Sequence, residues 1–257
     1  MNRKAKIKQI LFVVNQISYK ENMRKVIGTK WGGIWHVLSP FIYMLVLATY
    51  YQNIITHDIE MYPVFVFIGI SIMNFYRTAT IEAMDSLVNS RGLLQRTKLP
   101  IEVFVDVKVL SALKEFFYSI IALIPILIYF HVKISLRALE MIPIIIMTTL
   151  VIVGMGKILA LIYLFFGDID YLYRLFMTMM FFVSGVFIPL DDLPERFRFI
   201  LSYNPIFLSI YLSRNCLMYN VPSYYFAWVK MIIETILLYC LGSFVFYKNR
   251  NLCVSKL

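Results

Sequence analysis

Cysteine and histidine are scarce in this sequence of 257 residues, with three of each. The cysteines are scattered, odd in number and form no CxxC pair, so the sequence predicts neither a disulfide framework nor a cysteine metal site. The histidines lie far apart along the chain, and we expect no metal to be shared among them.

The sequence also lacks the motifs that carry common enzymatic chemistry. It contains no GxxxxGK[ST] phosphate loop, no HExxH and no GxSxG. Gly154-Met-Gly-Lys157 lies inside an apolar run, without the strand–loop–helix context of a phosphate-binding loop. We therefore expect no catalytic residue, metal or bound cofactor in this chain. Any ATP used to drive its function would be hydrolysed by another chain.

Charged residues make up only 16% of the sequence, whereas hydrophobic residues make up 60% and the mean hydropathy is +0.74. These values indicate an integral membrane protein. The net charge of +10 comes from Lys and Arg beside the apolar runs, which favours contact with membrane lipids and argues against nucleic acid. No secretory signal peptide is recognised, so we expect the first span to direct insertion.

Six apolar segments approach the length of a membrane-crossing helix: Ile34–Asn53, Met61–Ile81, Val107–Phe130, Met141–Phe166, Tyr173–Leu190 and Phe226–Tyr247. With six spans both termini share one side. Residues 1–32, 82–108, 167–174 and 248–257 together carry 16 Lys and Arg, against five in the opposite loops. The positive-inside rule then predicts that both termini are cytoplasmic.

The resulting fold class is an all-α membrane protein with one domain over residues 1–257. It comprises a cytoplasmic N-terminal segment (1–32), spans one to five (33–190), an outer segment (191–225), span six (226–247) and a cytoplasmic tail (248–257). In the first segment apolar residues recur at helical spacing, which predicts an amphipathic helix in the membrane interface. The residues predicted to lie on this interface helix include Lys6, Lys8, Ile10, Val14 and Lys20. Two interpretations stay open: a membrane anchor, or an anchor that also docks a cytoplasmic partner.

The longest cytoplasmic connection, residues 82–108, combines a helical apolar face with a basic stretch that stops at Pro100. This pattern is typical of a docking surface, although a purely positive-inside anchor explains the same residues.

Charged residues within the spans can be explained by structural roles. Arg77 and Lys114 sit near span ends where they can reach water, and Lys230 and Glu234 are spaced to pair on one helix face. A polar translocation path is the alternative.

Proline interrupts the chain after the fifth apolar segment. Ser184 to Leu190 is expected to close a helix, Pro189 and Pro194 bracket an acidic turn, and Asn204-Pro205 separates two short pieces, 196–201 and 206–212. Neither piece is long enough to cross a hydrocarbon core of about 30 Å. Broken backbone at membrane depth survives only where protein buries it or where it lines a watery cavity.

Several of these stretches resemble ABC type-2 permeases. Gly32-Gly-Ile-Trp35 followed by Pro40 is similar to the family's LGxLW…P pattern, and Leu93 to Pro100 is similar to its LxxKxxxP stretch. Asp168 with Tyr173-Arg174 partly matches the RD turn before span five, but Gly167 stands where the arginine is usual. The pattern from Ser184 to Pro205 resembles the SPxxYP…LP…NP region of polysaccharide exporters, with Gly185 in place of the first proline.

The resemblance implies a channel-forming subunit in the cytoplasmic membrane of a bacterium or archaeon, exporting a lipid-linked polysaccharide such as O-antigen, capsule or teichoic acid. It implies a homodimer with two ATPase subunits, which would use ATP and Mg. The N-terminal helix and a coupling helix between spans two and three would contact the ATPases. Two re-entrant helices between spans five and six would cap the exit. The coupling residues implied are Arg91, Leu94, Gln95, Arg96, Lys98 and Pro100, and the exit residues are Pro189, Pro194, Asn204 and Pro205.

Sugar polymers bind by stacking on aromatic rings beside a few polar groups, so aromatic residues are candidates for the translocation path. The candidates are Tyr43, Tyr50, Phe75, Tyr76 and Phe182, together with the charged Lys157. A type-2 permease for a drug, peptide or lipid is one alternative. An ion-coupled carrier is another, but it should show paired broken helices in both halves. A membrane-embedded transferase would need an acidic and basic cluster at one face.

Overall fold

The computed structural model describes residues 12, 15–20, 23, 34–52, 61–96, 99–189 and 194–256. These ranges form helices, turns and bends, and contain no strand. The predicted Lys6, Lys8, Ile10, Val14 and Lys98 lie outside the described residues, as does the side chain of Arg96.

In chain order the elements are α2 (Ile34–Gln52), α3 (Tyr62–Asn89), α4 (Arg91–Arg96), α5 (Glu102–Tyr129), the 3₁₀-helix η1 (Leu136–Glu140), α6 (Met141–Phe165), α7 (Ile169–Val183), α8 (Glu195–Leu201), α9 (Pro205–Arg214), the π-helix η3 (Asn215–Tyr219) and α10 (Tyr225–Lys256).

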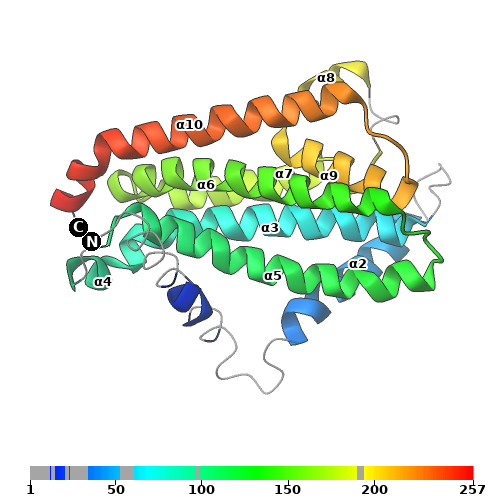
Figure 1. Cartoon of the computed structure of the whole chain (residues 1–257), viewed down its shortest axis with the longest axis horizontal. Coiled ribbons are helices and arrows are strands. Elements are labelled where there is room, and N and C mark those ends of the chain that lie inside the picture. The colour runs from blue at the N-terminus through cyan, green and yellow to red at the C-terminus, as the bar shows by residue number, and fades with distance from the viewer. Residues whose placement is uncertain are drawn as a thin grey trace.

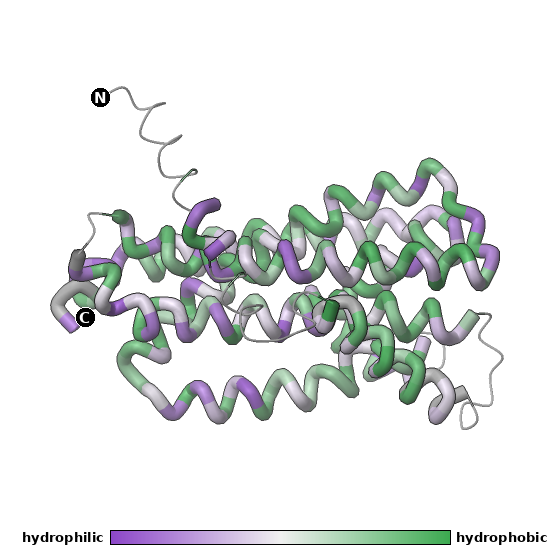
Figure 2. Tube along the Cα trace, turned by 90° about the horizontal axis from the view of Figure 1, so that it is seen from below, coloured by the Kyte–Doolittle hydropathy of each residue, from purple (hydrophilic) through white to green (hydrophobic). Residues whose placement is uncertain are grey.

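Four helical segments in the described part of the chain are long and apolar enough to cross a membrane: Tyr62–Asn89, Glu102–Tyr129, Leu136–Phe165 and Tyr225–Cys253. The expectation of an all-helical membrane protein is therefore confirmed for these ranges. Hydrophobic residues predominate along the long helices (Figure 2). The remaining two predicted spans correspond to α2, with 19 residues, and α7, with 15. At 1.5 Å per residue α7 extends about 22 Å, less than the hydrocarbon core.

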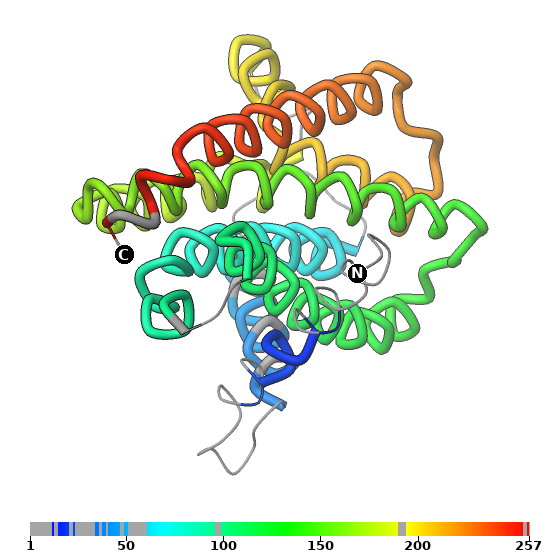
Figure 3. Tube along the Cα trace, turned by 60° about the vertical axis from the view of Figure 1, so that its left-hand side comes forward, coloured from blue at the N-terminus to red at the C-terminus, as the bar shows by residue number. Residues whose placement is uncertain are grey.

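The central helix of the bundle is α3. In its most apolar stretch 83% of the residues are buried inside the protein, compared with 22% in α10. A helix that is apolar all round belongs in a core, and α3 contacts α2, α5, α6, α7 and α9. On one side of α3, α10 packs against α6, and α2 lies on the opposite side (Figures 1 and 3). The exposed apolar face of α10 fits contact with lipid or another protein.

Glycine allows α6 and α10 to cross at very short range. A Cβ built on Gly154 of α6 would collide with the backbone of Leu238, and one built on Gly242 of α10 would collide with the backbone of Gly154. Small residues permit such close approach between membrane helices, where van der Waals contact stabilises the pair. The two helices therefore pack through their backbones at this point.

The fifth predicted span needs a correction. The sequence predicts a helix that continues through Ser184 to Leu190, but α7 ends at Val183 and residues 184–188 form bends. Gly185 causes the break, because its φ of +71° is a left-handed conformation that helical residues do not adopt. Gly185 stands where the resemblance leads us to expect a proline, and both residues interrupt a helix.

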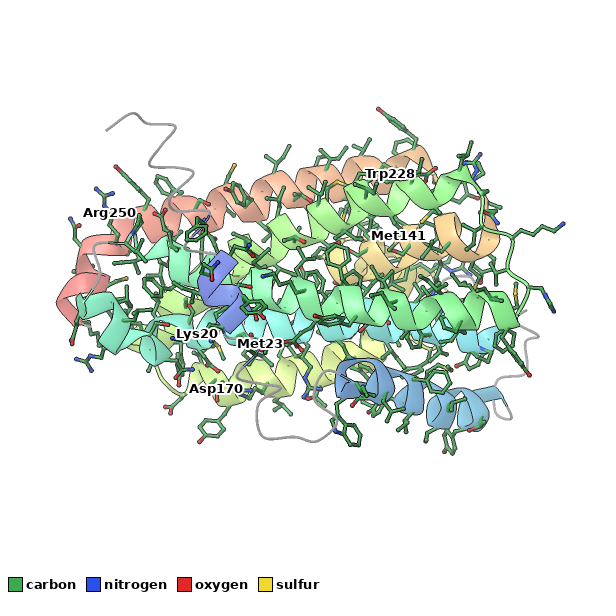
Figure 4. The ribbon with its side chains drawn as sticks, turned by 60° about the horizontal axis from the view of Figure 1, so that its bottom comes forward. Lys20, Met23, Met141, Asp170, Trp228 and Arg250 are labelled. Atoms are coloured by element: carbon green, nitrogen blue, oxygen red, sulfur yellow. The ribbon has the colours of Figure 1, made fainter. Side chains whose placement is uncertain are left out.

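The helices place two sets of connections at opposite ends of the molecule. The α4 end holds α4, the turn between α6 and α7, and the C-terminus of α10, whereas the α9 end holds α8 and α9 (Figure 1). Asp170 and Arg250 lie toward the α4 end, and Met141 and Trp228 toward the α9 end (Figure 4). Near the α4 end, helical residues 15–20 lie against α5: Ile17 packs on Val103 and Val107.

Candidate functional site

A cavity of about 480 Å³ opens between α2, α3, α5 and α7. Six aromatic side chains line it: Trp35, Tyr43, Phe75, Phe116, Phe181 and Phe182. The rings support one another across helices. Phe75 stacks on Phe116 with ring centres 4.8 Å apart, and Tyr43 meets Phe181 edge-on at 6.0 Å. The cavity therefore has walls that can stack against a flat or ring-shaped ligand.

The cavity also carries polar and charged groups. Arg77 and Asn74 project from α3 and Glu115 from α5, and the hydroxyls of Ser39, Ser71, Thr78, Ser119 and Thr178 complete the lining. Aromatic walls with a few convergent polar groups are typical of ligand sites, and the volume falls within their usual range. The sequence placed Arg77 near a span end where it reaches water. In the structure Arg77 is exposed and also lines the cavity, a position that local sequence spacing cannot reveal.

The predicted path residues separate into two groups. Tyr43, Phe75 and Phe182 line the cavity together. Tyr76 lies in the core instead, with its hydroxyl 3.5 Å from the sulfur of Met155. Three further residues line the cavity: Trp35, Phe116 and Phe181. The sequence does not predict them as path residues, since their common face depends on how four helices pack.

Lys157 and Tyr50 also lie away from the cavity. Lys157 is buried on α6, donates a hydrogen bond to Ser243 Oγ of α10 at 3.3 Å, and sits 5.3 Å from the centre of the Tyr239 ring. These contacts join α6 to α10. Tyr50, near the end of α2, is 62% exposed.

Arg214, at the end of α9, binds the broken backbone after α7. It is 5% exposed, and its guanidinium donates to the carbonyl oxygens of Gly185 at 2.7 Å, Val186 at 2.7 Å and Phe65 at 3.0 and 3.2 Å. Carbonyls that leave a helix in an apolar setting need such donors, because an unpaired buried carbonyl is costly. The guanidinium also lies over the Phe65 ring, 3.3 Å from its centre.

Two glycines make room for this arrangement. A Cβ on Gly69 of α3 would lie 2.7 Å from Nη2 of Arg214, and a Cβ on Gly185 would lie 2.9 Å from the Phe207 ring. From the sequence, Arg214 is only one of the basic residues of the predicted outer segment. Its role became visible only through carbonyl groups that are 28, 29 and 149 residues away in the sequence.

Ser184 and Asn204, two residues of the motif that resembles polysaccharide exporters, are in contact in the structure. Asn204 accepts a hydrogen bond from the backbone N–H of Ile206 at 3.0 Å, which caps α9, and its Nδ2 donates to Ser184 Oγ at 3.3 Å. Pro205 occupies the first turn of α9, where the missing N–H is not needed, and Pro194 directly precedes α8. Pro189 directly follows the bends formed by residues 184–188.

The short helices are fixed to the rest of the bundle. Ser209 of α9 lies 2.9 Å, hydroxyl to hydroxyl, from Thr148 of α6. Lys230 of α10 donates to Ser202 Oγ at 2.8 Å. The pair expected between Lys230 and Glu234 does not form, since Lys230 turns to the end of α8 and the carboxylate of Glu234 has no hydrogen-bond partner among the described residues.

At the α4 end, Arg174 connects α7 to α3. Its guanidinium lies 2.6 Å from Asp170 on its own helix and 3.1 Å from Asp85 on α3. Asp85 precedes α4 by less than about two helical turns, so the start of α7 is tied to the segment that leads into α4. The predicted coupling residues Arg91 and Gln95 are exposed on α4, whereas Leu94 packs against the core and Pro100 precedes α5.

The long apolar helices and the cavity among them define a polytopic helical membrane protein. The sequence model of the ABC-2 type transporter family matches residues 14–218, so this chain belongs to that family. It is similar to the O-antigen export system permease protein RfbA of Klebsiella pneumoniae, with 23% identity over 207 residues, 80% of each chain. A second Klebsiella pneumoniae protein of that name is 22% identical over 210 residues (81% of this chain, 78% of the relative). The Myxococcus xanthus protein of that name is 23% identical over 196 residues, 75% of each chain.

Proposed function

We propose that this chain is the membrane subunit of an ATP-driven exporter that moves a lipid-linked polysaccharide across the cytoplasmic membrane. Family membership supports a permease of an ABC-2 transporter, whose ATPase is a separate partner. The observation that carries the glycan proposal is the cavity, because six aromatic rings beside hydroxyl, amide and charged groups suit sugar rings better than a purely apolar cargo. The names of the relatives point the same way.

The remaining elements then have roles in such a transporter. Two copies of the chain pair in the membrane. In each copy α2 and the shorter α7 are the remaining two membrane helices, beside the four that are long and apolar enough to cross it. The α4 end faces the cytoplasm, in keeping with its excess of Lys and Arg. There α4 and the N-terminal helix contact two copies of the ATPase. The α9 end faces outward, with α8 and α9 as re-entrant helices over the exit.

Deleting the chain in its own host tests this function. We expect the surface polysaccharide to disappear and its lipid-linked form to accumulate inside the cell, with recovery when the chain is supplied again. Export of a drug, peptide or unglycosylated lipid in place of the glycan would identify the alternative type-2 permease. Unchanged surface polysaccharide would contradict the proposal.

A further inference from the structure

Arg77 of α3 differs from basic side chains on helices α5, α6, α7 and α10. In the part of the chain that the structure describes, Lys114 donates to Asn15, Lys157 to Ser243, Arg174 to two aspartates and Lys230 to Ser202. The Arg77 guanidinium has neither a hydrogen bond nor an ion pair with any described residue, and it lies at the wall of the cavity. An unpaired charge within a membrane protein marks a functional position.

The depth of Arg77 makes this difference more significant. It precedes Asp85 by eight residues on α3, which places it about 12 Å further from the α4 end along the helix axis. Asp85 there pairs with Arg174 at 3.1 Å. The side chain of Arg77 is exposed at the wall of the open cavity, so its guanidinium is free to meet a ligand that enters there. An anionic ligand in the cavity would supply the charged partner that Arg77 lacks among the described residues.

The other polar and aromatic groups of the cavity narrow the chemical class of the ligand. A guanidinium offers paired donors that match the oxygens of a phosphate. Glu115 and Asn74 can accept hydrogen bonds from hydroxyl groups, and the ring of Phe75 offers a stacking face. We propose that the cavity binds a glycosyl phosphate, with Arg77 on the phosphate and Glu115 and Asn74 on the sugar. This inference rests on the proposed function, and it assigns the junction of sugar and lipid phosphate to one position in the chain.

Binding to the purified full-length chain in detergent tests the proposal, with native mass spectrometry as the readout. Three probes are compared: a polyprenyl phosphate that carries one hexose, the same polyprenyl phosphate without the hexose, and phosphatidylglycerol. Arg77→Gln is the test variant. Arg250→Gln is the matched control, because Arg250 stacks on Tyr247 at the α4 end of α10, which does not line the cavity (Figure 4). Glu115→Gln reports on the sugar.

We expect Arg77→Gln to weaken binding of the hexose-bearing probe about tenfold or more, with Arg77→Lys partly restoring it and Arg250→Gln leaving it unchanged. Glu115→Gln should weaken that probe and spare the one without hexose. Equal binding by Arg77→Gln and the native chain would overturn the proposal. So would phosphatidylglycerol binding of equal affinity and equal dependence on Arg77, which would identify a membrane-lipid site.

The same variants in cells separate this inference from the proposed function. If deleting the chain abolishes polysaccharide export while Arg77→Gln binds the probe normally, the function stands and the glycosyl phosphate site is wrong. If the probe binds through Arg77 while deletion leaves export intact, the site stands as a binding site and the export function fails.

Discussion

The guanidinium of Arg214 donates a hydrogen bond to the carbonyl oxygen of Gly185 at 2.7 Å, joining the end of α9 to the break after α7. This contact explains how an irregular backbone is kept inside an apolar bundle. The chain leaves the helix at a glycine with a φ of +71°, and a buried arginine supplies the donors that the released carbonyls require. The break and the short helix therefore form one structural unit.

Replacing Arg214 should destabilise that unit strongly. Arg214→Leu keeps much of the packing volume but leaves the carbonyls of Gly185 and Val186 without their donor. We expect a loss of about 3 kcal/mol or more in the free energy of unfolding, measured by thermal or denaturant unfolding in detergent. Arg196→Leu on exposed α8 is the control and should stay within about 0.5 kcal/mol. A similar effect of both variants would show that the buried contacts carry no special weight.

Gly185→Ala should destabilise through the backbone. The new Cβ meets the Phe207 ring at 2.9 Å, and alanine is strained at a φ of +71°. We expect a cost of about 1–3 kcal/mol together with reduced export. Gly167→Ala is the matched control, because a Cβ added at Gly167 would meet open space within 4 Å. Unaltered stability of Gly185→Ala would mean that the left-handed turn is dispensable.

Gly242→Ala should push α10 away from α6. Its Cβ would collide with the backbone of Gly154, and a backbone clash cannot be relieved by a change of rotamer. Overpacking of this kind costs about 1–3 kcal/mol. The melting temperature of the purified chain should fall, whereas Gly92→Ala on α4, which has open space around it, should leave it unchanged. An unchanged melting temperature for Gly242→Ala would contradict the close crossing.

The basic residues of the coupling segment give a functional prediction. Reversing Arg91, Arg96 and Lys98 to Glu should lower export without preventing membrane insertion, because the proposed ATPase contact would lose its charge complementarity. The measurement compares surface polysaccharide with the amount of inserted chain. As a control, Arg250→Glu reverses one charge at the same end of the molecule but outside the coupling segment, and it should leave export unchanged. Full export by the triple variant would exclude a role for these charges in coupling.

Hydropathy and length were sufficient to predict α3, α5, α6 and α10, since long apolar helices leave a strong signal in the sequence. The end of α7 was predicted too late, because Gly185 breaks the helix through its φ and leaves the local hydropathy unchanged. Proline marks the starts of α8 and α9 well, because Pro194 directly precedes α8 and Pro205 is the first residue of α9.

The site was harder to predict, because it depends on residues that are distant in sequence. Tyr43, Phe75 and Phe182 were named for their chemistry, but their common cavity forms only when α2, α3 and α7 pack. Spacing pairs Lys230 with Glu234, because i and i+4 are neighbours on a helix, but Lys230 reaches Ser202 instead. Tertiary packing decides which of several possible partners a long basic side chain reaches.

Transport by the purified complex tests the central claim most directly. The chain and its ATPase are reconstituted into vesicles loaded with a lipid-linked glycan, and a glycosidase on the side facing the α9 end reports arrival of the sugar. We expect arrival only when both proteins and ATP with Mg are present. Transport by this chain without the ATPase, or no transport of the glycan by the complete system, would contradict the account.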